Sequence, residues 1–121
     1  MNNYLYMMNQ WLILKQEGKS IARYLERNSF SSVAVYGMAI YGRHVVRDLQ
    51  GTAITVAYGI DQKKMKPYLG VEIMQPTGAL PQADVIINSV IRDHMNIKAA
   101  LSQITDIPVI SLEEVVFGSY E

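Results

Sequence analysis

The stretch VAVYGMAIYGRHVVRDL, residues 33–49, decides the fold class of this chain. It runs from a short apolar string through Gly37 and Gly42 into a segment whose apolar residues follow helical spacing. A buried strand, a tight glycine turn and an amphipathic helix form the first unit of a Rossmann-like domain. We therefore expect a strand over residues 32–36 and a helix over residues 40–50. The residues predicted to face inward from this helix are Ile40, Val45, Val46 and Leu49.

The alternation of strands and helices continues along the chain. Further strands are predicted at residues 53–60, 71–74, 84–89 and 108–112, and further helices at 92–104 and 112–117. Such alternation indicates an α/β fold with a mostly parallel, five-stranded, doubly wound sheet of order 3-2-1-4-5. The third strand follows a connection of about ten residues, too short for a helical crossover, so we expect an edge strand reached by a loop. The residues expected to be buried on helix 92–104 are Met95, Ile97, Ala100, Leu101 and Ile104.

Residues 1–30 are predicted to form a helical N-terminal extension to the Rossmann-like domain of residues 31–121. Gly18 is expected to end a first helix, and Ser20 to begin a second one. The first helix has apolar residues on more than one face, and one domain surface covers only one face. We therefore expect a homo-oligomer or a partner domain to cover the rest. The residues on these faces are Tyr4, Met8 and Trp11 on one, and Tyr6 and Ile13 on another.

Composition narrows the function classes. The 121 residues fit one domain, and eleven basic residues balance eleven acidic ones, so no nucleic-acid partner is expected. The chain has no cysteine, which excludes disulfides, thiolate metal sites and a cysteine nucleophile. His44 and His94, the two histidines, do not stand at metal-ligand spacing and are both expected at the surface. No metal site, membrane span or signal peptide is predicted, and a cytoplasmic location is expected.

The glycine turn resembles a dinucleotide fingerprint, G-x-G-x-x-G, with one departure. Its residues are Gly37, Met38, Ala39, Ile40, Tyr41 and Gly42, so alanine takes the place of the middle glycine. That glycine lets the backbone approach a pyrophosphate, so the Ala39 methyl group crowds a dinucleotide but leaves room for a smaller anion. Asp61 stands nineteen residues after Gly42, where a carboxylate would accept hydrogen bonds from ribose hydroxyls. Alternatively, the glycines serve only the turn, and Asp61 caps the loop after the second strand.

Two polar residues mark the end of the fourth strand. Asn88 and Ser89 stand at the carboxyl edge of the predicted sheet, where ligands of open α/β sheets bind. Their alternative role is to cap the helix that follows. Arg43, just past the glycine turn, either reaches a phosphate or extends into solvent.

Four segments carry a resemblance: VAVYGMAIYGRHVVRDL, VAYGIDQ, ADVIINSV and IPVISLEEVV. They resemble small Rossmann-like, nucleoside-diphosphate-sugar epimerase-like proteins of bacterial surface-polysaccharide and glycosyltransferase gene clusters. The segment WLILKQEGKSIARYLE is similar to the N-terminal extension of the same proteins, so the resemblance covers nearly the whole chain. The strand ending in GID is similar to nucleotide-sugar-binding N-terminal domains of sugar acetyltransferases and 4,6-dehydratase relatives. The segment VEIMQPTGALPQADVIINSV is similar to the C-terminal domain of sugar C-methyltransferases. The resemblance implies nucleotide contacts by Gly37, Ala39, Gly42 and Asp61.

Three functional hypotheses follow. The first is a nucleotide or nucleotide-sugar binding module in bacterial surface-polysaccharide biosynthesis, not catalytic alone, with Gly37, Met38, Ala39, Ile40, Gly42, Asp61, Asn88 and Ser89 around the ligand. The second is an interaction or oligomerisation module with an empty crevice. The third is an NAD-dependent nucleotide-sugar epimerase or dehydratase. The chain argues against the third, because it leaves no room for a separate substrate domain and lacks a Tyr-x-x-x-Lys pair.

Overall fold

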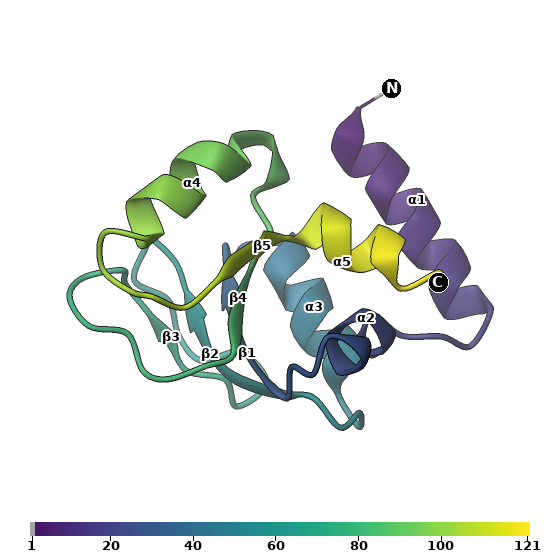
Figure 1. Ribbon diagram of the computed structural model, residues 1–121, viewed down its shortest axis with the longest axis horizontal. Helices are drawn as coiled ribbons and strands as arrows, with labels where there is room; N and C mark the ends of the chain where they lie inside the picture. The colour runs from purple at the N-terminus through teal and green to yellow at the C-terminus, as the bar shows by residue number, and fades with distance from the viewer. Residues whose placement is uncertain (1) are drawn as a thin grey trace.

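The computed structural model describes residues 2–121, and its centre is a five-stranded sheet in which every strand pairing is parallel. The strand order is β3-β2-β1-β4-β5, which confirms the predicted α/β, Rossmann-like topology (Figure 1). The third strand is a two-residue edge strand reached by a loop, also as predicted. The strand bounds are β1 Ser32–Tyr36, β2 Thr55–Ile60, β3 Ile73–Met74, β4 Val85–Asn88 and β5 Val109–Ser111.

Helices cover both faces of the sheet, but unequally. α1 (Asn3–Gln16), α2 (Ala22–Arg27), α3 (Tyr41–Leu49) and α5 (Leu112–Gly118) share one core with Val33 and Val35 of β1. The other face carries α4 (His94–Leu101), preceded by the short 3₁₀ helix η1 (Ile91–Asp93), and a smaller core around Ala34 and Tyr36. The strand residues alternate between the two cores because successive side chains of a strand point to opposite faces.

The N-terminal helices pack into the larger core. Met7, Trp11 and Leu14 are buried at helical spacing, and α1 packs against α5, so segments from opposite ends of the chain lie side by side (Figure 1). Gly18, with φ of +76°, follows α1 as predicted, because this backbone conformation favours glycine. Ser20 Oγ accepts a hydrogen bond from the Ala22 N–H at 3.0 Å, which supports the start of α2.

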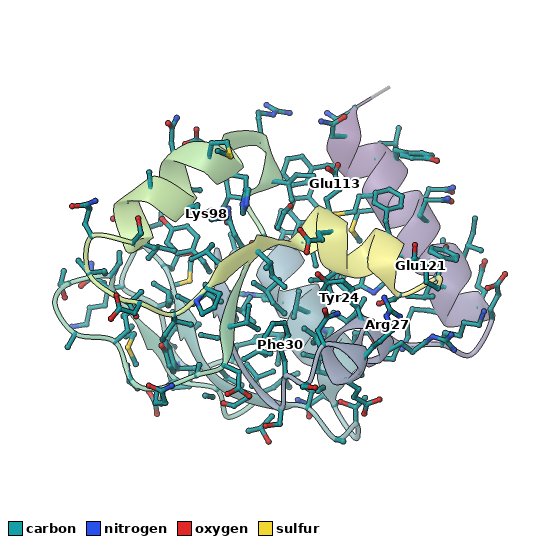
Figure 2. The ribbon with its side chains drawn as sticks, viewed as in Figure 1. Tyr24, Arg27, Phe30, Lys98, Glu113 and Glu121 are labelled. Carbon is teal, nitrogen blue, oxygen red and sulfur yellow. The ribbon has the colours of Figure 1, made fainter. Side chains whose placement is uncertain are left out.

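α2 is joined to α5 by polar contacts as well as by packing. Arg27 donates a hydrogen bond to the Gly118 carbonyl oxygen at 2.7 Å, and the Tyr24 hydroxyl donates to the Glu114 carboxylate. Figure 2 shows Tyr24 and Arg27 close to α5 and Glu121. A side chain at Gly118 would overlap the Tyr24 ring, so a glycine is needed for the close approach of the two helices.

Three predictions of burial are wrong. Met95 is 75% exposed because only one stripe of α4, ending in Leu101, faces the sheet. A residue two positions from Ile97 points about 200° away from it around a helix, and Met95 is such a residue. Ile40 is 62% exposed because it precedes the first turn of α3 and has φ of −126°, so it does not lie on the buried stripe of that helix. Ala100 is also exposed.

Candidate functional site

The turn between β1 and α3 is shaped by its two glycines. Gly37 has φ of +87°, and a side chain there would overlap Ser89 Oγ. A side chain at Gly42 would overlap the Gly37 carbonyl oxygen, although Gly42 itself has no positive φ. Both glycines are therefore required by the architecture of the turn, independently of any ligand.

Met38 lies beneath the turn rather than in the crevice above it. Its side chain is fully buried, and a Cβ at Gly59 of β2 would lie only 2.8 Å from Met38 Cγ. The side chain therefore fills the space between the turn and the sheet. This position makes Met38 a packing residue of the site, while its backbone belongs to the turn.

Asp61 joins β2 to the turn. Its Oδ2 accepts a hydrogen bond from the Met38 N–H at 2.8 Å, and its Oδ1 accepts one from the Lys63 N–H at 2.9 Å. Both carboxylate oxygens thus already have a backbone donor. Each oxygen retains acceptor capacity, since a carboxylate has about four lone-pair sites.

Asn88 and Ser89 are buried at the end of β4 and bond to neighbouring loops. Ser89 Oγ donates to the Gly37 carbonyl oxygen at 2.6 Å, which joins β4 to the glycine turn. Asn88 Oδ1 accepts from the Val90 N–H at 2.9 Å. The helix that follows, η1, has Val90 as its N-cap residue and receives no side-chain cap. Asn88 and Ser89 therefore do not cap this helix, the alternative role considered for them, and bond to neighbouring loops instead.

His94 is half-buried, contrary to its expected surface position. Its Nδ1 lies 3.1 Å from Asn88 Nδ2. Burial lowers the pKa of the ring, and the nearby Lys98 charge lowers it further. The neutral ring can accept a hydrogen bond from the Asn88 amide at Nδ1. His44 is exposed, as predicted.

A crevice of about 230 Å³ opens at the turn, at the carboxyl edge of the sheet. Ala39 and Ile40 line it, and their N–H groups make no hydrogen bond with any of residues 2–121. Ile40 is the N-cap residue of α3 and gives no side-chain cap to the helix. Free N–H groups at a helix N-terminus favour an anion. The lining residues are Tyr4, Gly37, Ala39, Ile40, Tyr41, Asp61, Ser89 and Val90.

An aromatic pair forms one wall of this crevice. The Tyr4 and Tyr41 rings stack with centroids 4.5 Å apart and planes inclined by 19°. The Arg92 guanidinium lies 5.8 Å from the centroid of the Tyr4 ring. A neighbouring hollow of about 760 Å³ shares Tyr4, Tyr41 and Val90 with the crevice and includes Arg92. This wall was not predictable from the sequence, because nothing local to Tyr41 indicates contact with a helix far away in the chain.

The predicted site residues therefore divide into two groups. Gly37, Ala39, Ile40, Asp61 and Ser89 line the crevice. Met38, Gly42 and Asn88 support it from beneath or behind. Arg43 is exposed, the second of its two expected positions; its Nε donates to the Met38 carbonyl oxygen at 3.0 Å, and its guanidinium lies 5.0 Å from the Tyr68 ring centroid.

The chain matches no protein-family model, no curated protein and no solved structure. Within residues 2–121, no three histidine, aspartate or glutamate side chains gather closely enough to hold a metal ion. Across the same residues, no helix has the length and apolar character needed to cross a membrane.

Proposed function

We propose that this chain is a binding module for a nucleotide or nucleotide-sugar, held at the glycine-turn crevice. The observation that carries the proposal is the uncapped start of α3, where Ala39 and Ile40, whose N–H groups have no hydrogen-bond partner among residues 2–121, line a crevice at the carboxyl edge of β1. Open α/β sheets bind their ligands at this edge, where the strand order reverses. The sequence resemblance supports a role in bacterial surface-polysaccharide biosynthesis.

The crevice favours a phosphate group over a full dinucleotide. Its volume of about 230 Å³ is below the ~300 Å³ at which ligand pockets usually begin, so it suits one part of a larger ligand. We place a phosphate at the Ala39 and Ile40 amides, where the helix dipole also favours negative charge. The adjoining hollow of about 760 Å³ would receive the sugar or the base.

Two neighbouring groups fit the rest of such a ligand. The stacked Tyr4 and Tyr41 rings offer an aromatic edge to a base. Asp61 has acceptor capacity beyond its two backbone donors and would take a ribose hydroxyl. We assign no chemical step to this site, because its titratable lining groups are two tyrosines and a carboxylate already bonded to the backbone.

The test is a melting-temperature and calorimetric titration with UDP, UDP-glucose, dTDP and NAD, using the full chain and the variant Ile40→Asp. Ile40 is exposed, and an acidic residue at the start of a helix is favourable, so the variant should fold. Its carboxylate would repel a phosphate at the amides, so we expect at least tenfold weaker binding. Met95→Asp, exposed on α4, is the matched control.

Two results would overturn the proposal. One is the absence of any melting shift with all four compounds. The other is binding that Ile40→Asp leaves unchanged. Tight binding of NAD alone would instead favour the epimerase or dehydratase hypothesis.

A further inference from the structure

α1 presents an apolar stripe whose two leucines are exposed among residues 2–121. Leu5 is 63% exposed and Leu12 is 56% exposed, and Met8 lies half-buried between them. The spacing places these side chains on one face of the helix, opposite part of its buried stripe. Exposed apolar side chains gathered in this way mark interaction surfaces more often than isolated ones do.

The stripe borders a concave surface, which we name the α1–α3 groove. The groove is a hollow of about 300 Å³ between the two helices. Met8 also lines the larger hollow near Tyr41, so this one side chain borders both depressions. The residues that line the groove include Met8, Trp11, Leu12, Lys15, His44 and Arg47.

The base of the groove is fixed by Asp48. Its Oδ2 accepts hydrogen bonds from Trp11 Nε1 at 2.7 Å and the Ile21 N–H at 3.3 Å, and its Oδ1 pairs with Lys15 Nζ at 2.7 Å. Asp48 is buried, and its charge is compensated by these donors. The His44 ring lies edge-on to the Trp11 indole, with centroids 6.2 Å apart. The groove therefore has an ordered base that projects no free negative charge.

The α3 side of the groove is basic. The Arg43 and Arg47 guanidinium carbons lie 5.0 and 5.8 Å from the Tyr68 ring centroid, and no carboxylate of residues 2–121 lies within 4.0 Å of either group. The loop that carries Tyr68 also has three exposed lysines, at 63, 64 and 66. Residues 38–68 thus contain five arginines and lysines but two aspartates, Asp48 and Asp61. Both aspartates are hydrogen-bonded within the fold.

We propose that the α1–α3 groove binds an acidic amphipathic helix of another protein. Leu5 to Lys15 spans eleven residues of α1, or about 15 Å from first to last, which accommodates roughly three turns of a docked helix. Apolar residues of that helix would pack on Leu5, Met8 and Leu12, and its carboxylates would meet Arg43 and Arg47. Apolar anchors at helical spacing with complementary flanking charge are the usual features of helix-in-groove recognition.

Charge and shape favour this occupant over two others. One alternative is a second copy of the chain, with its α1 packed against this α1. Residues Asn3–Gln16 contain no aspartate or glutamate, so that helix would offer no carboxylate to Arg43 and Arg47. An anionic bilayer would meet the exposed leucines, but it is flat and would leave the hollow above Trp11 unfilled. Only a convex partner with apolar and acidic side chains satisfies both the hollow and the basic side.

The test uses the full chain to select binders from a displayed library of randomised helical peptides about 15 residues long. We expect enriched peptides to carry apolar residues at i, i+3 or i+4, and i+7, flanked by aspartate or glutamate. Synthesised peptides should change the fluorescence of Trp11, the single tryptophan. Leu12→Gln and Arg47→Glu should each weaken binding at least tenfold. The control is Met95→Gln, which changes an exposed side chain on α4, and this variant should bind the peptides as the unmodified chain does.

Several outcomes would overturn the proposal. These are a selection that enriches nothing, enriched peptides without acidic residues, or binding that neither groove variant weakens. Sedimentation as a dimer that Leu12→Gln dissociates would assign the stripe to a second copy. Cosedimentation with phosphatidylserine vesicles, lost in Leu12→Gln, would assign it to a membrane surface. Circular dichroism of each variant shows whether it is folded.

Discussion

Asp61 holds the glycine turn in place by accepting a hydrogen bond from the Met38 N–H at 2.8 Å. The carboxylate follows β2, and the amide follows β1, so this bond joins the ends of two adjacent strands. The residue proposed to meet a ligand is therefore also one that maintains the shape of the site. Any experiment on Asp61 must separate these two roles.

Replacing Asp61 should lower stability without any ligand present. Asp61→Ala leaves the Met38 and Lys63 N–H groups without their acceptor, and we expect a loss of about 1–3 kcal/mol, the typical cost of an unsatisfied polar group. Asp61→Asn retains one acceptor oxygen and should lose less. Urea unfolding measures both. Unchanged stability of the alanine variant would show that other contacts hold the turn.

Gly42→Ala should destabilise the protein more than Gly51→Ala does. The new methyl group at position 42 would overlap the Gly37 carbonyl oxygen, and overpacking of this kind costs about 1–3 kcal/mol or more. Position 51 has open space but φ of +75°, so alanine there meets only backbone strain of about 1–2 kcal/mol. Chemical denaturation of the two variants compares them, and equal losses would count against the overlap.

Trp11→Phe should weaken the contact between α1 and α3 while largely keeping its apolar packing. The substitution removes the donor to Asp48 Oδ2, which then retains only the longer bond from the Ile21 N–H. We expect a loss of about 1–3 kcal/mol in the free energy of unfolding. Adding Asp48→Asn tests the coupling in a double-mutant cycle. Strictly additive effects would show that the bond contributes nothing measurable.

Tyr24 should make the protein sensitive to alkaline pH. Burial, and secondly the hydrogen bond to Glu114, together raise the pKa of the hydroxyl to about 12. The folded state therefore holds the proton more tightly than the unfolded state, whose tyrosine pKa is about 10. This contribution is complete below about pH 10 and is lost as the pH rises toward 12.

The test for Tyr24 measures the free energy of unfolding of the unmodified chain and of Tyr24→Phe as a function of pH. The pH range runs from about 9 to about 12, the pKa of Tyr24 in the folded state. The unmodified chain should lose stability more steeply, because phenylalanine has no proton to release. Parallel curves would contradict the prediction. Subtracting the two unfolding free energies at each pH removes the contributions of the other tyrosines and of the lysines, which are the same in both proteins.

The order of the sheet was predictable because the glycine turn and the β-branched runs are local signals. Gly37, Gly42 and the apolar residues of β1 determine a strand, a turn and a helix within a short stretch. The edge position of β3 followed from the length of its connection. These features depend on residues that are close together in the sequence, so the spacing of those residues is enough to predict them.

The environment of the site could not be predicted in the same way. Tyr4 and Tyr41 meet only because α1 packs beside the start of α3, and neither tyrosine has a local pattern that indicates its partner. Met38 and Ile40 are both apolar, yet the first is buried and the second is exposed. The direction of a turn side chain depends on backbone angles that helical or strand periodicity does not specify.

The packing of α1 against α5 has a consequence for synthesis of the chain. α1 is made before every strand of the sheet, but residues 112–118 of α5 are made only after them. Until then, α1 must emerge from the ribosome without one of the surfaces that later covers it. Contacts between distant segments also slow folding, because a long loop must close before they form. The nascent chain therefore passes through an interval in which its N-terminal helix is open to chaperones or to aggregation, and that interval ends only when the C-terminal helix docks.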